Sequence, residues 1–430
     1  MKVSVVGLGK IGLPLAVQFA SKGCEVVGCD VNEATTQLVN SGVEPFPGEY
    51  ELSERLESVV RSGHLVATTE TTQAVLQSDV VVVVVPLFVD AEGVPDFSWM
   101  DSATEDIARG LRRNSLVIYE TTLPVGTTRD RFAKMLSELS GLVAGQDFHV
   151  AFSPERVFTG RVFSDLRRYP KLVGGLTKKC GSAAENFYCS VLDFDDRHDL
   201  PEPNGVWNLG SPEAAELAKL AETTYRDVNI GLANQFALFA QKNGIDIYAV
   251  IDACNSQPFS HIHRPGIAVG GHCIPIYPRM YLWNDPEATI VRSARESNAA
   301  MPRFAVDLLE AELGDLKNRS IVVLGAAYRG GVKETAFSGV FPTVRELELR
   351  GANVAVHDPL YSDEELESLS FTPYHFGDPV EGAILQADHG TYSDLTATHL
   401  PGVKVMIDGR NVIPASSDFR AIQIGRGQLT

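Results

Sequence analysis

Cys273 lies in the segment PGIAVGGHCIPIYP, residues 265–278, among glycines and prolines and directly after His272. A cysteine that only fills space usually sits in an apolar strand or helix. In a glycine-rich loop, the backbone can approach a ligand and backbone amides can lower the pKa of a thiol. The segment therefore fits a nucleophilic thiol, although an inert thiol fits it as well. Metal binding by Cys273 with His261, His263 and His272 matches no usual ligand spacing.

Three glycines near the start of the chain suggest a nucleotide site. Gly7, Gly9 and Gly12 form the pattern G-x-G-x-x-G after an expected strand and at the start of an expected helix. There the backbone can approach a pyrophosphate, and helix amides can bind it. Asp30 ends the next strand, where a carboxylate binds a ribose diol and repels a 2′-phosphate. The glycines alone could simply close a tight turn, but with Asp30 they predict an NAD site.

Polar side chains follow two further expected strands. The segment VIYETTLPVGTT places Glu120, Thr121 and Thr122 at the end of one strand, and VAFSPERV places Glu155 and Arg156 at the end of the next. Open α/β sheets hold their ligands at the carboxyl edge of the strands. These residues are therefore candidates for binding a substrate or cofactor. A capped turn and a surface ion pair are the alternatives that the sequence leaves open.

A third group of polar residues lies on an expected helix. Lys219, Thr223 and Arg226 recur at spacings of four and three residues, so they share one helix face. Such a stripe is usually only a solvated face. It becomes a candidate site only in combination with other evidence.

The elements that position these residues begin with one βαβ unit in the first 30 residues. Further strands are expected at residues 79–86, 115–120 and 148–152, separated by helical or polar stretches. This alternation favours an open parallel sheet with helices on both faces. We expect an NAD-binding Rossmann domain over residues 1–200.

The middle of the chain is predicted to be helical. After a linker-like stretch at residues 198–210, a helix is expected to start with Ser211 as N-cap and Pro212 at its first position, and to stop near Gly244. At about 30 residues it is long for a globular protein, and such helices often form a spine between domains or a dimer interface. We expect a central helical domain over residues 201–315 that mediates dimerisation.

The last part of the chain repeats the opening pattern. Residues 323–327 correspond to residues 5–9, and Asp358 at the end of the following strand corresponds to Asp30. We therefore expect a C-terminal Rossmann-like domain over residues 316–430. The predicted fold class is α/β, with two Rossmann-like doubly wound domains joined by a central helical domain with a long spine helix.

Composition excludes several classes of protein. The chain has 430 residues and a net charge of −18, which argues against nucleic acid or an anionic membrane as the main partner. The apolar run DVVVVVPLFV is about half as long as a membrane span. The start of the chain lacks the pattern of a signal peptide. Six widely spaced cysteines suggest neither a disulfide framework nor a metal site, so we expect a cytoplasmic protein.

Taken together, these segments resemble the UDP-glucose/GDP-mannose dehydrogenase family of nucleotide-sugar 6-dehydrogenases. GLGKIGLPLA, TTLPVGTT, SPERV, EAAELAKLAETTYRDVNIGLAN, PGIAVGGHC and LGAAYRGG occur in the family's order and at its spacings. TYRDVNI is most similar to the UDP-N-acetylmannosamine dehydrogenase branch. The resemblance implies oxidation of the sugar's C6 alcohol to a uronic acid, a four-electron reaction that uses two NAD⁺ per turn.

The resemblance also implies catalytic roles. Cys273 would be the nucleophile that forms a thiohemiacetal and then a thioester. Lys219 would stabilise oxyanion character, and Glu155 would activate the water that attacks the thioester. Thr122 would position a water near C6.

Further contacts follow from the same resemblance. Residues expected to contact NAD are Gly7, Gly9, Ile11, Gly12, Asp30, Pro86, Thr121 and Thr122. Residues expected to contact the substrate are Glu155, Arg156, Val157, Lys219, Thr223, Gly270 and Arg329. Arg329 would hold the pyrophosphate, so the C-terminal domain would bind UDP. The expected partners are the nucleotide sugar and a second copy of the chain, and no metal is expected.

Five positions depart from the family's pattern, the first being Arg329, where relatives usually have lysine. Thr223 and Tyr277 stand where relatives have asparagine and aspartate, and Phe259 and Ala336 stand where relatives have arginine. A relative that stops at the aldehyde, one that uses UDP-glucose or TDP-glucose, and a silent nucleotide-sugar-binding protein therefore remain alternatives. Retention of the expected nucleophile, lysine and base favours an active enzyme. The exchange of charged for apolar side chains predicts a preference for an N-acetylated or otherwise less polar sugar.

Overall fold

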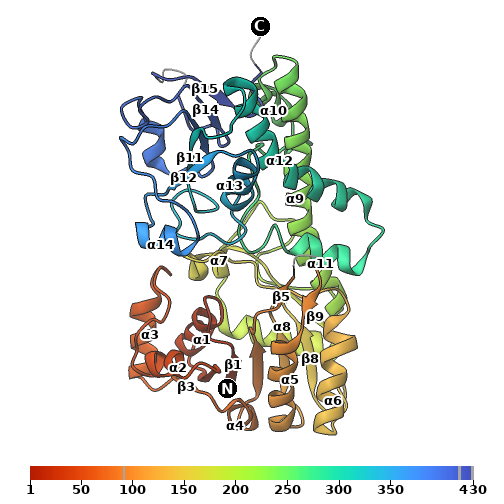
Figure 1. Cartoon of the computed structure of the whole chain (residues 1–430). Coiled ribbons are helices and arrows are strands. Elements are labelled where there is room, and N and C mark those ends of the chain that lie inside the picture. The colour runs from red at the N-terminus through yellow and green to blue at the C-terminus, as the bar shows by residue number, and fades with distance from the viewer. Residues whose placement is uncertain (91–92, 415–417, 428–430) are drawn as a thin grey trace. The chain divides into compact units, whose positions relative to one another are not determined.

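The computed structural model describes residues 1–90, 93–414 and 418–427 and is drawn in Figure 1. The chain divides into an N-terminal unit, Met1–Ala221, and a C-terminal unit, Glu222–Thr430. Each unit contains one large sheet, and each is described by itself below.

Eight strands form the sheet of the N-terminal unit, in the order β10-β9-β8-β7-β4-β1-β2-β3. These strands are β1 (Lys2–Val6), β2 (Glu25–Cys29), β3 (Leu65–Thr68), β4 (Val80–Val83), β7 (Leu116–Tyr119), β8 (His149–Phe152), β9 (Lys171–Gly175) and β10 (Val206–Asn208). A separate hairpin pairs β5 (Phe88–Val89) with β6 (Pro95–Asp96). The helices are α1 (Gly12–Ser21), α2 (Glu33–Asn40), α3 (Leu52–Arg61), α4 (Thr71–Leu76), α5 (Ser98–Gly110), α6 (Ala133–Ser140), α7 (Val162–Arg168) and α8 (Lys178–Val191), and a π-helical turn, Thr128–Phe132, precedes α6.

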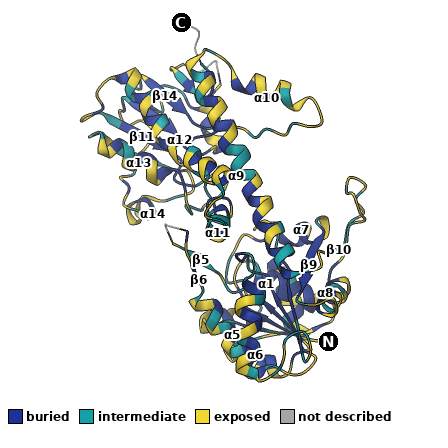
Figure 2. Ribbon diagram, turned by 90° about the vertical axis from the view of Figure 1, so that its right-hand side faces the viewer, coloured by how far each residue is buried: buried dark blue, intermediate teal, exposed yellow. Residues whose placement is uncertain are grey.

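Helices cover both faces of this sheet because successive strand residues point to opposite faces. Val82 and Ile118 pack with residues of α1, α3, α7 and α8. Val81 and Val117 pack with residues of α4, α5 and α6. The strands are accordingly buried, and the exposed residues lie on the outer sides of the helices (Figure 2). The predicted Rossmann architecture of this region is confirmed.

Two strands, β9 and β10, run opposite to the other six. All neighbouring pairs in the sheet are parallel except β8 and β9, which are antiparallel with Phe152 opposite Gly174. The sequence predicted a parallel sheet and did not identify this reversal. As a result, Lys171, the first residue of β9, lies at the carboxyl edge of β8.

The predicted spine helix is α9 (Pro212–Lys242), a single helix of 31 residues. The Ser211 hydroxyl accepts a hydrogen bond from Ala214 N at 3.2 Å, as expected of its N-cap residue. Part of the stretch that precedes α9, predicted to be a linker, instead forms the edge strand β10, which pairs in parallel with β9. Residues of α9 up to Ala221 belong to the N-terminal unit, and the remainder belong to the C-terminal unit.

The C-terminal unit contains a five-stranded parallel sheet in the order β12-β11-β13-β14-β15. Its strands are β11 (Ser320–Leu324), β12 (Asn353–His357), β13 (Gly382–Leu385), β14 (Val405–Asp408) and β15 (Ala421–Gln423). Its other helices are α10 (Ile247–Asn255), α11 (Tyr277–Asn284), α12 (Thr289–Leu313), α13 (Val340–Leu349) and α14 (Asp363–Ser368), with a 3₁₀ turn at Gly390–Asp394. α12 and α13 pack on one face of the sheet, whereas loops and the 3₁₀ turn cover much of the other.

The predicted internal repeat is visible in the hydrogen bonds. The Asp30 carboxylate accepts a bond from Leu8 N at 2.9 Å, and the Asp358 carboxylate accepts bonds from Ala326 N and Ala327 N at 2.9 Å each. In both units an acid at the end of the second strand therefore binds the glycine turn after the first strand. Asp358 is only 3% exposed and also contacts His389 Nε2 at 3.1 Å. Asp358 thus has a structural role in its turn.

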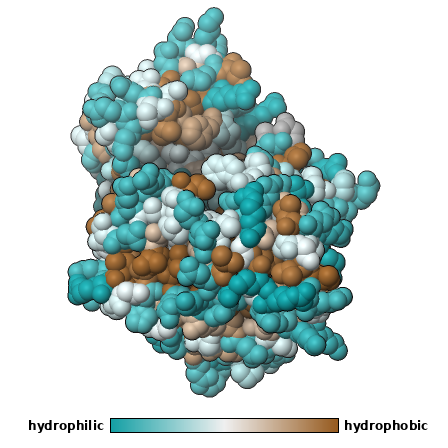
Figure 3. All heavy atoms as spheres, turned by 90° about the horizontal axis from the view of Figure 1, so that it is seen from below, coloured by the Kyte–Doolittle hydropathy of each residue, from teal (hydrophilic) through white to brown (hydrophobic). Residues whose placement is uncertain are grey.

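The surface mixes polar and apolar residues. On the face shown in Figure 3, hydrophobic side chains form patches separated by hydrophilic ones. Within the described ranges, no helix combines the length and apolar character that a bilayer crossing requires. All six cysteines lie in the described residues, and each is a free thiol.

Candidate active site

The glycine turn after β1 leaves space for a ligand. A Cβ atom at Gly12 would lie 1.8 Å from Gly7 O, and Gly7 itself has a φ of +97°. Only glycine therefore fits at these two positions without rearrangement. A Cβ atom at Gly9, in contrast, would meet no atom within 4 Å. This open space beside the amino end of α1 suits a pyrophosphate that approaches the backbone closely.

Asp30 keeps capacity for a ribose. Its two carboxylate oxygens each accept one backbone hydrogen bond, from Leu8 N and from Asn32 N, both at 2.9 Å. A carboxylate has about four acceptor positions, so each oxygen can accept another bond. Asp30 is half-buried, in contrast to the fully enclosed Asp358. The turn and Asp30 together fit a bound NAD.

The other residues predicted to contact NAD lie near the same edge of the sheet. Ile11 precedes α1 and packs partly against the core. Pro86 is exposed shortly after β4, and the Thr121 hydroxyl donates to Val85 O at 2.6 Å. Thr122 is buried at 6% exposure. β1, β4 and β7 are adjacent and parallel, so their carboxyl ends bring these residues to one edge.

A buried glutamate holds the loop after Thr122. The Glu216 carboxylate, on α9, accepts hydrogen bonds from Gly126 N at 2.6 Å and Thr128 N at 2.8 Å. Burial raises the pKa of Glu216 to about 7. Lys219 follows three residues later on nearly the same helix face and is 8% exposed. Glu216 is not among the predicted site residues, and its only signal in the sequence is a glutamate at a core-spaced position between Ala215 and Leu220.

A buried ionic group lies at the carboxyl edge of β7 and β8. Lys171 Nζ donates to Glu120 Oε2 at 2.9 Å and to Glu155 Oε2 at 2.8 Å. Glu120 and Lys171 are 1% and 4% exposed, and the Glu155 side chain is 11% exposed. We call Glu120, Lys171 and Glu155 the buried triad. The sequence predicted a catalytic role for Glu155 and raised Glu120 as a candidate at a strand end, but it did not indicate Lys171.

Surrounding groups complete the triad's hydrogen bonds. The Tyr188 hydroxyl, on α8, donates to Glu120 Oε1, and Lys171 Nζ lies 4.8 Å from the centre of the Tyr188 ring. Glu155 Oε1 accepts a bond from Arg156 N at 2.7 Å. Both carboxylates are therefore held in defined orientations.

The electrostatics of the triad differ between its two carboxyls. Burial raises the pKa of Glu120 to about 7, with the Lys171 charge opposing this rise and the Glu155 charge adding to it. Burial acts in the same direction on Glu155, but the Lys171 charge and hydrogen bonds outweigh it and lower the pKa of Glu155. Burial acts to lower the pKa of Lys171, but the two carboxylates outweigh it and raise that pKa. Glu155 is thus the carboxyl that stays ionised at neutral pH.

The segment after Glu155 is fixed from two sides. Arg156 Nη1 contacts Pro170 O at 3.4 Å, and Val157 packs partly against the core. The Glu49 carboxylate accepts bonds from Gly160 N at 2.5 Å and Val162 N at 2.6 Å. Glu155 and its two predicted neighbours therefore project from an anchored loop.

In the C-terminal unit, Cys273 is exposed in the loop before α11. Its carbonyl oxygen accepts bonds from Tyr277 N at 2.9 Å and Ile276 N at 3.2 Å, which form a turn into the helix. Polar residues of α9 hold the start of the loop: Asn229 Oδ1 accepts from His263 N and Asn234 Oδ1 accepts from Gly266 N, both at 2.9 Å. Asn229 and Asn234 of α9 thus position the segment that leads to Cys273.

The glycines before Cys273 pack against the second glycine turn. A Cβ atom at Gly270 would lie 2.5 Å from the Tyr328 Cβ. Gly271 N donates to Ala336 O at 2.8 Å, and His272 Nε2 lies 3.2 Å from Glu334 Oε2. Residues 270–272 and 328–336 are therefore neighbours although they are far apart in the sequence.

Other predicted substrate residues of this unit differ in exposure. Arg329 follows Tyr328 directly and is exposed, with its Nε 3.2 Å from the Tyr328 hydroxyl. Thr223 is 4% exposed on α9. Phe259, which stands where relatives have arginine, is 92% exposed in the loop after α10. The structure thus brings Gly270, Cys273 and Arg329 into one region of the C-terminal unit.

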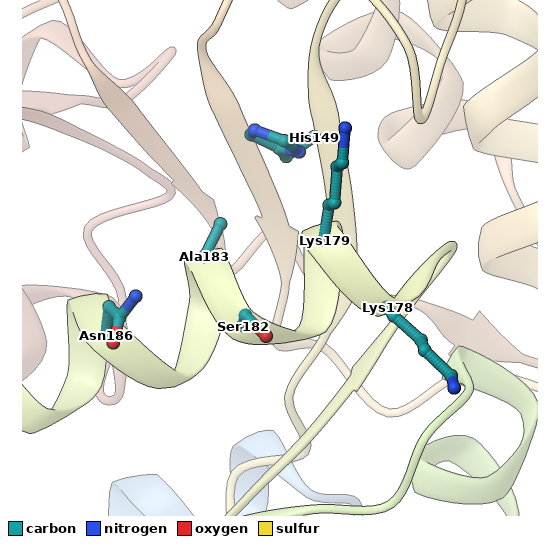
Figure 4. Close-up of a pocket in the computed structure, with 6 residues that line it drawn as sticks. All are labelled: His149, Lys178, Lys179, Ser182, Ala183 and Asn186. Atoms are coloured by element: carbon teal, nitrogen blue, oxygen red, sulfur yellow. The ribbon is translucent and has the colours of Figure 1, made fainter.

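A shallow pocket of about 420 Å³ lies elsewhere on the N-terminal unit, and Figure 4 shows the residues that line it: His149, Lys178, Lys179, Ser182, Ala183 and Asn186. Burial and the charge of Lys179, which lies beside the ring, lower the pKa of His149. His149 begins β8, so the pocket is at the opposite end of this strand from Glu155. In the part of the chain that the structure describes, His, Cys, Asp and Glu side chains form no group of three or more suited to a metal ion.

Comparison with known proteins identifies the class. Models of the UDP-glucose/GDP-mannose dehydrogenase family match in three consecutive segments: the NAD binding domain at residues 1–192, the central domain at 213–300 and the UDP binding domain at 322–415. The chain is therefore an oxidoreductase that uses NAD and has a domain for a UDP-linked substrate.

Individual relatives agree with this class. The chain is 37% identical to the UDP-N-acetyl-D-mannosamine dehydrogenase of Pyrococcus horikoshii over 445 aligned residues that cover 100% of both sequences. The solved UDP-N-acetyl-D-mannosamine dehydrogenase structure from that organism matches with a TM-score of 0.87, 34% identity and complete coverage of both chains. A UDP-glucose dehydrogenase structure from Pyrobaculum islandicum matches with a TM-score of 0.85 and 28% identity, covering 99% of this chain and 98% of its own. The chain belongs to the UDP-glucose/GDP-mannose dehydrogenase family. The fold class, the family and NAD as cofactor, all predicted from the sequence, are confirmed.

Proposed function

We propose that this enzyme oxidises the C6 alcohol of a UDP-linked acetamido sugar of the N-acetylmannosamine type to the carboxylic acid. The observation that carries the proposal is the position of Cys273. Cys273 is exposed in a glycine loop that packs against residues 328–336. Residues 328–336 belong to the segment that matches the UDP binding domain. A thiol beside a UDP site suits attack on the sugar part of the bound substrate.

The thiol explains how an alcohol can reach the carboxylate level. NAD⁺, which the glycine turn and Asp30 would hold, would supply the hydride acceptor for two successive oxidations at C6. After the first, C6 is an aldehyde, and Cys273 Sγ bonds to it while the thiol proton passes to the carbonyl oxygen, giving a thiohemiacetal. Loss of a second hydride and of the hydroxyl proton gives a thioester on Cys273. Water then bonds to C6, the C6–S bond breaks, and the acid and the thiol are released.

Other residues support these steps. We propose that Lys219 stabilises negative charge on the C6 oxygen and that Thr122 orients a water close to C6. Glu155 accepts a proton from the water that attacks the thioester. This role requires an ionised carboxylate, and the lowered pKa of Glu155 keeps it ionised at neutral pH. Arg329 binds the pyrophosphate.

Arg156, Val157, Thr223 and Gly270 provide additional contacts that orient the sugar in this proposal.

The substitutions near Cys273 support an acetamido sugar. Tyr277 starts α11, four residues after the thiol, and the Ala336 carbonyl binds the loop that carries the thiol. Loss of a charged hydrogen bond to a hydroxyl typically costs about 1.5 to 3 kcal/mol, whereas an aromatic surface favours a methyl group. Relatives named UDP-N-acetyl-D-mannosamine dehydrogenase agree with this choice.

We expect UDP-N-acetylmannosamine to give the highest kcat/KM in a panel with UDP-N-acetylglucosamine, UDP-glucose, TDP-glucose and GDP-mannose. Its advantage over UDP-glucose should be about tenfold or more, since one lost contact is worth this factor. With limiting sugar, the absorbance of NADH should show two NADH per sugar consumed.

The outcomes separate the alternatives. One NADH per sugar would show that the enzyme stops at the aldehyde, and none with any sugar would indicate a binding protein. A clear lead for UDP-glucose would contradict the proposed role of the apolar substitutions while leaving the reaction type intact.

We also propose that the enzyme forms a homodimer through α9. Four large side chains at spacings of seven, four and three residues share one face of its second half. They are Tyr225, Leu232, Phe236 and Phe239, at 55%, 43%, 39% and 64% exposure. An exposed apolar stripe of this length is typical of a surface that another chain covers.

Replacing Phe239 with glutamate should convert the dimer to a monomer, because the stripe would then bury a charge. Sedimentation velocity measures the change. Leu349→Glu is the matched control, because Leu349 is also an exposed apolar residue, at 72%, but lies on α13. A wild-type monomer, or a Phe239→Glu dimer, would contradict this assignment.

A further inference from the structure

We propose that Lys171 is a positioning residue for Glu155, and that the protonation of Glu120 controls how strong a base Glu155 is. This inference rests on the proposed function, because it concerns the carboxylate assigned to thioester hydrolysis. It adds two residues of the buried triad to the machinery of that step.

The fold supplies the first reason. β9 is antiparallel to β8, and the register that pairs Ala151 with Gly175 and Phe152 with Gly174 places Lys171 opposite Glu155 when it is continued. β7 is parallel to β8, so Glu120 comes to the same edge directly after Tyr119. Two parallel strands thus bring a carboxylate each to the edge at which the antiparallel strand β9 places its lysine.

The contacts supply the second reason. Lys171 Nζ bridges the two carboxylates at 2.8 and 2.9 Å, and Glu155 has little freedom because Arg156 N holds its other oxygen at 2.7 Å. The ammonium group of Lys171 is directed at the two carboxylates, and the Glu155 side chain is the more accessible of the pair, at 11% against 4% exposure. Lys171 therefore acts on the reaction through Glu155.

The charges supply the third reason. Two buried carboxylates share one ammonium, and the titratable groups that act most strongly on Glu120 and Glu155 are each other, Lys171 and Tyr188. When Glu120 takes up a proton, Lys171 is left to pair with Glu155 alone, and a neighbouring negative charge is lost. Both changes lower the proton affinity of Glu155. A weaker base accepts a proton from the attacking water less readily, so hydrolysis slows as Glu120 becomes protonated.

The consequence for hydrolysis can be written as a proton balance. The water oxygen bonds to C6 of the thioester, one water proton passes to Glu155, and the C6–S bond breaks. The same proton can then return from Glu155 to the thiolate of Cys273. Glu120 and Lys171 exchange no proton with the substrate, so their removal should change only the rate and pH dependence of this step.

The test uses the full-length enzyme with UDP-N-acetylmannosamine and NAD⁺ in pre-steady-state experiments from pH 5.5 to 9. Wild-type hydrolysis, followed by mass spectrometry of the adduct on Cys273, should slow as the pH falls through the range near 7 in which Glu120 titrates. Glu120→Gln keeps an amide oxygen to accept from Lys171 and an NH2 group that can donate to the Tyr188 hydroxyl, but it cannot titrate. Its hydrolysis should be slower by about tenfold at pH 8, the effect of about one pKa unit at the base, and should lack this acidic limb.

Lysine variants test the positioning role. Lys171→Met should slow hydrolysis by about 100-fold while KM for the sugar and for NAD⁺ changes less than twofold, and Lys171→Arg should restore a large part of the rate. If Lys171→Met fails to fold, Glu120→Gln and Lys171→Arg still decide the question. A wild-type pH profile and rate in Glu120→Gln would overturn the proposal and show that the triad is only structural.

A spectroscopic readout needs no activity. Infrared difference spectra of the wild type should contain carboxyl bands that titrate near 7, and Glu120→Gln should lose one of them. Glu216→Gln assigns the other, because burial also raises the pKa of Glu216 to about 7.

If the wild type oxidises no nucleotide sugar, the proposed function fails and this inference fails with it. If it yields two NADH per sugar but neither spectra nor hydrolysis respond to Glu120→Gln, this inference alone fails.

Discussion

Cys273→Ser should abolish formation of the uronic acid, with a loss of about 1000-fold or more, because a serine hydroxyl at neutral pH is a far weaker nucleophile than a thiol. Binding of NAD should be unchanged, since the glycine turn and Asp30 belong to the other unit. The measurements are the acid formed, by mass spectrometry, and the Kd for NADH, by fluorescence.

The matched control is Cys254→Ser, which changes a second free cysteine of the same unit near the end of α10. This variant should keep two NADH per sugar. Acid formation at the wild-type rate in Cys273→Ser would contradict the role of nucleophile, whereas equal losses in both variants would indicate a general effect on folding.

Gly9→Ala and Gly12→Ala should both weaken NAD binding, but only Gly12→Ala should also destabilise the enzyme. A methyl group at Gly12 would lie 1.8 Å from Gly7 O, so the turn must open. We expect the unfolding midpoint of Gly12→Ala to fall by about 5 to 10 °C, as for a severe packing clash. A methyl group at Gly9 meets no protein atom but occupies the space assigned to the pyrophosphate.

Gly9→Ala should therefore weaken NAD binding by about 10-fold to 100-fold at an unchanged unfolding midpoint, since a displaced phosphate loses one or two charged hydrogen bonds. Calorimetry and titration of NADH fluorescence measure the two quantities. Wild-type affinity in Gly9→Ala would show that the pyrophosphate does not approach this position.

Several features could be predicted from local sequence. The N-cap at Ser211 depends on neighbouring residues, and the glycine turn with Asp30 and its repeat at Asp358 each lie within one recurring strand–helix–strand unit. Helix capping, and glycines followed by an acid at the end of the next strand, can be recognised without knowing the tertiary structure. Cys273 could also be recognised from the sequence. Its glycine-rich surroundings suggested a reactive thiol, and the family resemblance implied the role of nucleophile.

Other features were decided only by tertiary structure. Lys171 lies beside Glu155 because β9 runs antiparallel to β8, and neither strand's own sequence specifies its partner or direction. In the sequence Glu216 is an ordinary helix residue, and only the folding of the loop at Gly126 against it gives it a role. Strand pairing and loop docking are chosen by the burial of side chains from distant segments, which no short stretch of sequence contains. The sequence therefore determined the two glycine turns and the candidate nucleophile, whereas the tertiary structure decided which buried charges hold the proposed base.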